Sequence, residues 1–189
     1  VELGSDLPEL PAARFDRLVE AGLTEPTALA LAVDADLAGF LDAVATATGD
    51  LKTSANWTMG EFSAHLNGAG LSANQSPVTP ERLAALIALV VDGTINQTAA
   101  KEVFGVLVED PQATPAGVVA DRNLAQVGGD DALGEIIDAV LAAHPEEVEA
   151  FKGGREQVIG FLVGQCMKQS GGRADAKALQ GLLRARLNG

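Results

Sequence analysis

Residues 157–169 read QVIGFLVGQCMKQ, and this stretch decides the fold class. On a wheel of 100° per residue, the bulky apolar side chains share one face: Val158, Ile159, Leu162 and Cys166. The opposite face carries smaller and polar residues: Gln157, Gly160, Gly164 and Lys168. This pattern predicts an amphipathic α-helix with one buried side. It also predicts that Cys166 is a buried structural thiol rather than a nucleophile.

The two glycines of this helix need an explanation. A glycine inside a helix costs about 1 kcal/mol relative to alanine, and Gly160 and Gly164 lie one turn apart. Close approach of another backbone is the usual compensation. One interpretation is a neighbouring helix of the same domain. The alternative is the sugar–phosphate backbone of an RNA, which would run along a flat track flanked by Gln157 and Lys168.

Downstream, Ser170 to Asp175 form a glycine-containing turn before another helical pattern at 175–187. Such a turn can present backbone N–H groups to an anion, here with Lys168, Arg173 and Lys177 around it. A helix N-cap at Asp175 is an alternative that does not exclude the first. In the last helix, Lys177 and Arg184 fall opposite the leucine stripe. Arg186 falls beside the leucines, so we expect a snorkelling stem or a frayed end.

Upstream, the sequence contains repeated helix signals and no sustained alternation typical of strands. The first two predicted helices are 11–21 and 26–33. The next is capped by Asp34 and ends near Gly49, and another begins at Thr53 or Ser54 and ends near Gly68 or Gly70. Further helices are predicted from Thr79-Pro80 to Gly93 and from a cap at Asn96, with short ones at Thr114-Pro115 and His144-Pro145. A further helix is predicted at 131–143. The fold class is therefore all-α.

The helical pattern breaks between Asp110 and Asp131, where prolines, glycines and small polar residues gather. We place a domain boundary at the end of this break, near residues 124–130. The prediction is a helical middle domain over 1–124 and a small helical-bundle tail domain over 125–189.

Charge is distributed unevenly. The 189 residues carry 13 basic and 26 acidic side chains, a net charge of −13. Residues 151–189 reverse the sign with seven basic and two acidic side chains: Lys152, Arg155, Lys168, Arg173, Lys177, Arg184 and Arg186 against Glu156 and Asp175. A basic tail on an acidic body is a hint of a polyanion partner. The simpler interpretation is a basic terminal helix, since cations favour helix C-termini.

Several classes of function lack support in the sequence. It holds no GxxxxGK[ST], HExxH or GxSxG motif. One cysteine and two histidines, His65 and His144, are too few for a common zinc cluster and show no partners at ligand spacing. The longest apolar run, 83–91, is shorter than the ~20 residues of a membrane span. We therefore predict no catalytic residue, no metal site and no membrane association.

The segment Phe161 to Lys168, followed by Gly171 to Asp175, resembles the C-terminal signature of the B subunit of the tRNA-dependent amidotransferase, roughly GFLVGQxMKxTxGKAxP. Earlier blocks agree with this family in order along the chain: Leu7–Pro11, Ala55–Phe62, Leu66-Asn67, Ser76-Pro77, Asp92–Ile95 and Ala100–Phe104. The resemblance thus runs nearly end to end. Standalone YqeY-like proteins share the later blocks but not Leu7–Pro11.

The resemblance implies a fold, a reaction and partners. The family's enzyme converts glutamate or aspartate, mischarged on tRNA(Gln) or tRNA(Asn), to the amide, as a carbon–nitrogen ligase. Its B subunit uses ATP and Mg²⁺ to activate the carboxylate, its A subunit supplies ammonia, and the two are braced by a small C subunit. The kinase part lies in an N-terminal portion that this chain lacks, so no cofactor is expected here. The chain is similar to the middle domain and YqeY-like tail, which binds tRNA in the cytoplasm.

The expected tRNA-binding residues are Gln165, Lys168, Gly171, Gly172, Arg173, Lys177 and Arg184. The first five match the family motif, and the last two come from the basic face of the final helix. Arg173 replaces the usual lysine, which keeps the charge and changes the donor geometry. Cys166 and Asp175 also depart from the pattern.

A second hypothesis comes from a different class of function. The acidic residues 1–150, with a net charge of −18, could dock a basic protein such as a synthetase or another component of the amidotransferase, without direct tRNA contact. The simpler interpretation of that acidity is a solubilising surface.

Overall fold

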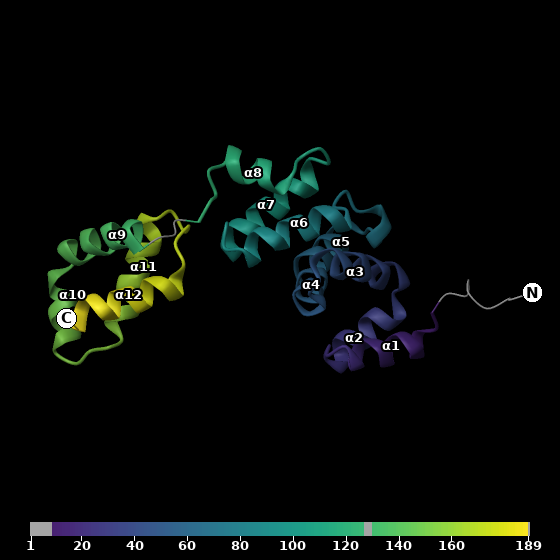
Figure 1. Ribbon diagram of the computed structural model, residues 1–189, viewed down its shortest axis with the longest axis horizontal. Coiled ribbons are helices and arrows are strands. Elements are labelled where there is room, and N and C mark those ends of the chain that lie inside the picture. Colours follow the sequence, from purple (N-terminus) through teal and green to yellow (C-terminus); the bar gives the residue numbers. More distant parts are fainter. Residues whose placement is uncertain (1–8, 127–129, 189) are drawn as a thin grey trace, which may run out of the picture. The chain divides into compact units, whose positions relative to one another are not determined.

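The computed structural model describes residues 9–126 and 130–188 (Figure 1). Within these residues the chain forms helices and turns and no extended strand, which confirms the all-α prediction. Two compact units are distinguished. One comprises residues 1–88 and 104–115, and the other comprises 89–103 and 116–189. The predicted Leu7–Pro11 segment lies partly outside the described residues, and the predicted boundary near residue 124 stays a prediction.

The helices of the N-terminal half follow the sequence signals closely. They are α1 (Pro11–Glu20), α2 (Glu25–Val33), α3 (Ala35–Thr48), α4 (Leu51–Trp57), α5 (Ser63–Ala69), α6 (Pro80–Val91), α7 (Gln97–Glu109) and α8 (Pro115–Asp121). Asp34 caps α3 through a 2.9 Å bond from the Leu37 N–H. Gly49 ends that helix in the left-handed conformation, as its sequence position predicted.

One helix start was predicted wrongly, and one irregular turn was missed. The cap of α4 is Asp50 rather than Thr53 or Ser54, because the Asp50 carboxylate accepts from both the N–H and the hydroxyl of Thr53. Between α4 and α5 the chain makes a π-helical turn, Thr58–Phe62. The Thr58 carbonyl accepts there from the N–H of Ser63 and from its hydroxyl at 2.7 Å, which stabilises the wider turn.

Ionic contacts join the first helices. Arg17 donates to the carboxylates of Glu9 and Asp42, and so links the start of α1 to α3. The hydrogen bond from Arg17 is the main cause that lowers the pKa of Glu9. The neighbouring Arg14 is buried and donates to the Ala32 carbonyl of α2 at 3.1 Å. Charged side chains therefore fix the packing of α1 on the next two helices.

Arg82 links several segments of the first unit through hydrogen bonds. Its guanidinium donates to four backbone carbonyls, those of Pro77, Leu107, Asp110 and Ala113. The last turn of a helix leaves carbonyls without partners, and Arg82 supplies donors to the end of α7 from the first turn of α6. Burial lowers the pKa of this guanidinium, a direction that marks its partial removal from water.

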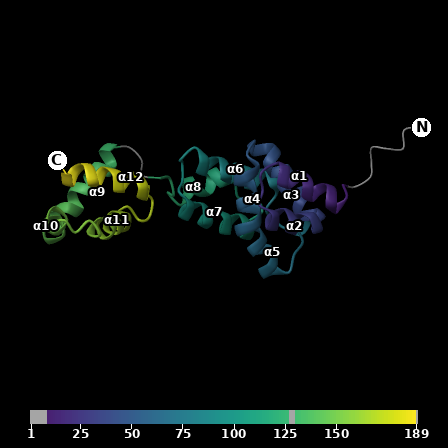
Figure 2. The same ribbon diagram turned by 90° about the horizontal axis from the view of Figure 1, so that it is seen from below.

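The C-terminal helices are α9 (Asp130–Ala143), α10 (Pro145–Lys152), α11 (Val158–Gln169) and α12 (Ala176–Asn188). They pack on one another around an apolar core of their own (Figures 1 and 2). Its buried members are Leu133, Ile137, Val140, Ile159, Leu162, Cys166, Ala174, Leu179, Leu183 and Leu187. We call these four helices the tail bundle. Its helix ranges agree with the predicted ones to within one residue at most ends.

We predict that Arg82→Met lowers the free energy of unfolding of the first unit by about 2–3 kcal/mol, because hydrogen bonds from a charged donor are among the stronger ones and four carbonyls lose a partner. Urea unfolding followed by the fluorescence of Trp57, the single tryptophan, measures this change in the unit that contains Arg82. Lys52→Met is the matched control in the same unit, since Lys52 is exposed on α4 and its replacement should cost under about 0.5 kcal/mol. Equal losses in the two variants would contradict the role given to Arg82.

Candidate nucleic-acid interface

The α11 helix is amphipathic as predicted. Ile159, Leu162 and Cys166 are buried in the core of the tail bundle, the last two completely. Gly160, Gly164 and Lys168 on the opposite face are exposed. Burial raises the pKa of the Cys166 thiol, which therefore stays protonated at neutral pH. Cys166 is thus a packing residue, in line with the sequence interpretation.

The two glycines of α11 are not covered by a neighbouring helix. A Cβ built on Gly160 or Gly164 meets no atom within 4 Å outside its own helical turn. The interpretation that another helix of the domain packs on them is therefore wrong for the described residues. What remains is a strip of α11 without side chains, open to solvent, with Lys168 at its end.

The glycine turn after α11 does not present the amides that the sequence suggested. Gly171 and Gly172 both have positive φ, and their N–H groups donate back to the carbonyls of Lys168 and Met167. The N–H groups of Arg173 and Ala174 donate to Ser170. These amides are used to end the helix, so an anion site built from them is not supported.

Asp175 is confirmed as the N-cap of α12. One carboxylate oxygen accepts from the N–H groups of Lys177 and Ala178, at 2.7 and 2.8 Å. A negative side chain therefore already occupies the position where an anion would bind at this helix start. The Asp175 carboxylate would repel an anion at this helix start.

Arg173 braces the turn rather than pointing to solvent. Its Nε donates to the Ser170 carbonyl and its Nη1 to the Asn123 carbonyl, at 3.1 and 3.2 Å. The same turn receives a 2.6 Å bond from the Asn96 amide to the Gly172 carbonyl. Gly171, Gly172 and Arg173 thus form a hydrogen-bonded turn inside the second unit.

Two cations of α12 remain on its outer face. Lys177 and Arg184 are exposed and two turns apart, as the wheel predicted. Arg186 does not lie in a frayed end, since α12 continues to Asn188; it pairs with Asp138 of α9, and its guanidinium lies against Gly134, where a Cβ would meet Nη2 at 3.3 Å. The outward cations of α11 and α12 are therefore Lys168, Lys177 and Arg184. Gln165, the remaining predicted residue, is half-buried on α11.

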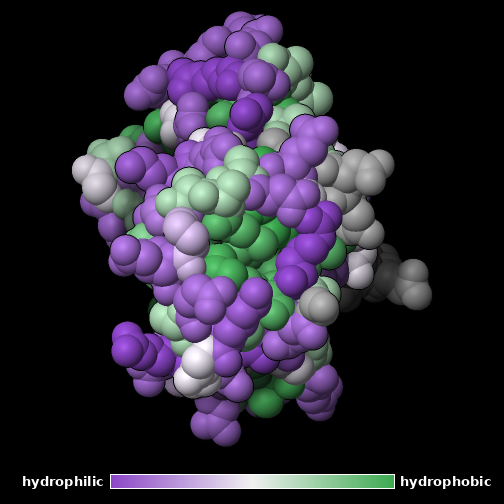
Figure 3. Space-filling model, turned by 90° about the vertical axis from the view of Figure 1, so that its left-hand side faces the viewer, coloured by the Kyte–Doolittle hydropathy of each residue, from purple (hydrophilic) through white to green (hydrophobic). Residues whose placement is uncertain are grey.

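The sequence analysis missed Phe161. Its side chain is 44% exposed although it is a large aromatic, and its ring meets that of His144 edge-on with centroids 5.2 Å apart. The helical periodicity could have indicated this exposure, since Phe161 falls on the same side of α11 as Lys168. Figure 3 views the molecule from the side of the tail bundle and shows apolar groups at the surface, ringed by hydrophilic ones.

His65 and His144 have structural surroundings. His144 takes the position before α10, with Nδ1 3.7 Å from the Glu147 carboxylate. His65 is half-buried, and its ring lies edge-on to Phe104 with centroids 6.3 Å apart. The expectation that neither histidine is a catalytic base stays a prediction.

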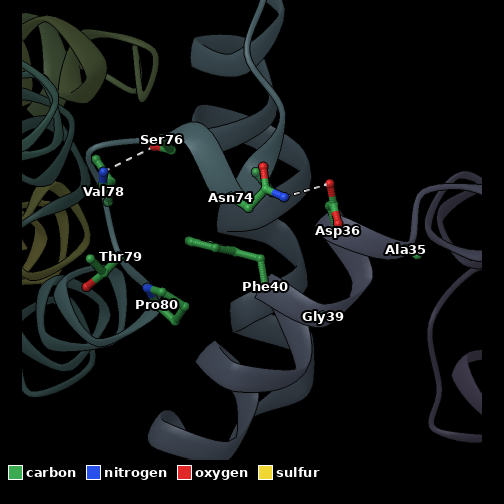
Figure 4. A pocket seen from close by; sticks show the side chains of 10 residues that line it. Ala35, Asp36, Gly39, Phe40, Asn74, Ser76, Val78, Thr79 and Pro80 are labelled. Atoms are coloured by element: carbon green, nitrogen blue, oxygen red, sulfur yellow. Dashed lines mark hydrogen bonds between the residues drawn. The ribbon is translucent and has the colours of Figure 1, made fainter. Parts of the chain in front are cut away.

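A separate hollow of about 370 Å³ lies between α3 and the start of α6. Figure 4 shows Phe40 projecting into it and the Asn74 amide bonded to the Asp36 carboxylate at 3.1 Å. Its lining residues include no cation. Among the described residues no three His, Cys, Asp or Glu side chains gather as metal ligands, and no described helix is long and apolar enough to cross a membrane.

Comparisons with known proteins agree with the resemblance. Residues 39–187 match the model of the GatB domain. The chain is 40% identical over 186 residues to the B subunit of the aspartyl/glutamyl-tRNA(Asn/Gln) amidotransferase of Parasynechococcus marenigrum, covering 98% of this chain and 38% of that protein. It is 40% identical over 185 residues to the chloroplastic/mitochondrial B subunit of the glutamyl-tRNA(Gln) amidotransferase of Physcomitrium patens, covering 98% and 33%. This chain therefore spans between 33% and 38% of the length of these two relatives.

We predict that Cys166, the single cysteine, reacts slowly with a thiol reagent in the folded chain. A local opening free energy of about 3 kcal/mol would slow labelling roughly 100-fold relative to the chain unfolded in urea. The rate of labelling by Ellman's reagent measures this protection.

Leu183→Ala should speed the labelling markedly, because Leu183 is fully buried in the same core and its truncation costs about 2–5 kcal/mol. An exposed substitution on the same helix, Gln180→Ala, is the control and should leave the rate unchanged. Fast labelling of the unmodified chain would show that Cys166 is not held in the core.

Proposed function

The chain belongs to the GatB domain family, and from that premise we propose that it is the tRNA-binding portion of an amidotransferase of this family, within the B subunit. Its role is to hold mischarged Glu-tRNA(Gln) or Asp-tRNA(Asn) while a portion outside this chain, together with partner subunits, carries out the ATP-dependent conversion to the amide. Holding a substrate in place can supply several kcal/mol to a reaction without any catalytic side chain.

The observation that carries the proposal is the set of outward cations on the tail bundle. Lys168, Lys177 and Arg184 are exposed, and none forms an ion pair with a described side chain. They stand on two helices that pack side by side, in a chain whose net charge is −13. A local excess of unpaired cations on an acidic protein is typical of a surface that meets phosphates.

The expected mode of binding is recognition of backbone and shape. Three phosphate contacts make the affinity dependent on salt and nearly independent of base sequence. The open glycine strip of α11 lets a sugar–phosphate backbone approach the helix closely, which offsets the cost of the two glycines. Structured RNA is recognised largely through such shape and phosphate contacts.

The glycine turn contributes by geometry. Gly171, Gly172 and Arg173 fix the end of α11 and the start of α12, and so hold Lys168 and Lys177 at opposite ends of one turn. We therefore assign Arg173 a positioning role in tRNA binding, since its donors are engaged with backbone carbonyls. Gln165 is placed beside the strip as a neutral hydrogen-bonding neighbour.

Partners and cofactors are part of the same proposal. The proposed partners are tRNA(Gln) and tRNA(Asn), the A and C subunits and a synthetase, in the cytoplasm or in an organelle. ATP and Mg²⁺ are assigned to the portion outside this chain, as the family resemblance implies. The domain boundary near residue 124 is supported by the separate core of the tail bundle.

The test compares the chain with a variant in which Lys168, Lys177 and Arg184 become glutamine. Fluorescence anisotropy of a labelled tRNA(Gln) transcript is followed across a salt series. We expect binding by the unmodified chain to weaken steeply with salt, and the variant to lose about two to three units of the log–log salt slope.

Two controls separate charge from structure. Lys52→Gln removes an exposed cation on α4, and it should leave the salt slope unchanged. Arg173→Gln should lower tRNA affinity and thiol protection of Cys166 together, because it loosens the turn. Equal salt slopes for the unmodified chain and the three-cation variant would place the RNA contact elsewhere.

A specific observation also favours the second hypothesis, a protein-docking role for residues 1–150. On α2, Leu29 and Val33 lie one turn apart and are 59% and 75% exposed, while Ala28, Leu31 and Ala32 fill the buried side. A helix that is apolar all round is usually covered on both faces. This face is suited to a protein surface rather than to RNA.

For this hypothesis we predict that Leu29→Ser with Val33→Ser weakens association with the A and C subunits about tenfold and leaves tRNA binding unchanged. Both positions are exposed, so the stability of the chain should change by less than about 0.5 kcal/mol. Co-purification and titration with the partner subunits measure the effect. Unchanged association would remove the α2 face from consideration as a docking site.

A further inference from the structure

Phe161 is an unusual surface residue in the tail bundle. Among the exposed large apolar side chains of the described residues, Phe161 is the aromatic one and the one that lies on α9–α12. The core of the bundle is complete without it, since Ile159 and Leu162 on either side of it fill the buried face of α11. Packing in the apolar core therefore does not explain why an aromatic ring stands at this position.

The ring has a defined orientation. The imidazole of His144 meets it at an interplanar angle of 90°, with centroids 5.2 Å apart. Edge-to-face pairs of this kind are favourable and hold the two rings in a defined relative orientation. The ring of Phe161 is thus oriented by a neighbour while the residue remains 44% exposed.

The neighbours of Phe161 on α11 suit a nucleotide. Gly164 follows at i+3, Gln165 at i+4 and Lys168 at i+7, so all four project from one side of the helix. Outside its own helical turn, no described atom lies within 4 Å of a Cβ built on Gly164 or on Gly160. A backbone can thus pass over the glycines, with the amide of Gln165 and the ammonium of Lys168 within reach.

We propose that Phe161 stacks on an unpaired base of a structured RNA, whose backbone crosses Gly160 and Gly164 and reaches Lys168. The inference rests on the proposed tRNA-binding function and deepens it by naming the substrate class: an RNA that offers an unstacked loop base. A continuous duplex hides its base faces, and proteins stack aromatic side chains on bases that loops expose.

Charge complementarity favours RNA over a protein partner for this surface. Residues 158–188 carry five basic side chains against the single acid Asp175, which already caps α12. The exposed ring suits the base of a nucleotide, the glycine strip suits its sugar, and the lysine suits its phosphate. An apolar protein partner would use the ring but would leave the strip and the cation without a role.

The experiment uses the full 189-residue chain and two RNA probes: a hairpin with a seven-nucleotide loop, and a blunt duplex with the same stem. Phe161→Leu keeps an apolar side chain and removes the ring. We expect it to weaken hairpin binding about tenfold, to leave duplex binding unchanged and to leave the salt slope unchanged. Phe161→Trp should restore hairpin affinity, and its fluorescence should fall on addition of the hairpin, over the constant signal of buried Trp57.

The matched control is Lys168→Gln, which should weaken binding of both probes and reduce the salt slope. Failure of the unmodified chain to bind either RNA would overturn the proposed function itself. Binding of both probes with no effect of Phe161→Leu would overturn the stacking proposal and leave tRNA binding standing. An equal loss of hairpin and duplex binding in Phe161→Leu would also overturn the stacking proposal, because it would indicate a structural role for the ring. A loss confined to association with the A and C subunits would overturn it too, because it would indicate a protein contact.

Discussion

The rotation of α11 about its own axis is the constraint on which the tail bundle depends. Leu162 and Cys166, one turn apart and without contact to solvent, anchor the helix in the core formed with α9 and α12. A helix has only one way to bury such a stripe, so the same burial turns Gly160, Gly164 and Lys168 outward. Burial of the apolar face of α11 by the hydrophobic effect thereby determines which residues of this helix face the solvent.

The hydrogen bonds of the turn after α11 limit what this surface can do. A glycine-rich turn before a helix N-terminus often binds anions through its amides. Here Gly171 and Gly172 close the preceding helix, and Asp175 accepts from the first amides of the next one. The positive φ of both glycines belongs to this closure. These engaged amides are not available to an anion at this turn, whereas side-chain cations extend further and adapt more readily than a fixed set of amides.

Charge within the tail bundle is divided between its helices. Acidic side chains gather on α9 and α10, including Glu135, Glu146, Glu147 and Glu149, and basic ones gather on α11 and α12. The Asp138–Arg186 pair joins the two groups between α9 and α12. A polyanion meets repulsion from one side of such a bundle and attraction from the other. The acidity of the whole chain is therefore compatible with an RNA contact that is local and oriented.

The sequence by itself determined the all-α class, many of the helix ends, the buried face of α11 and the caps at Asp34, Asn96 and Asp175, because these depend on residues within one or two helical turns. It also carried the family resemblance. The sequence did not determine whether Gly160 and Gly164 are covered, or which groups Arg173 and Arg186 contact. Their roles depend on which distant segments come within a few ångströms: no described helix over the glycines, Asn123 at Arg173, and Asp138 at Arg186. Such contacts are set by packing between helices far apart in the chain, and only the tertiary structure decided them.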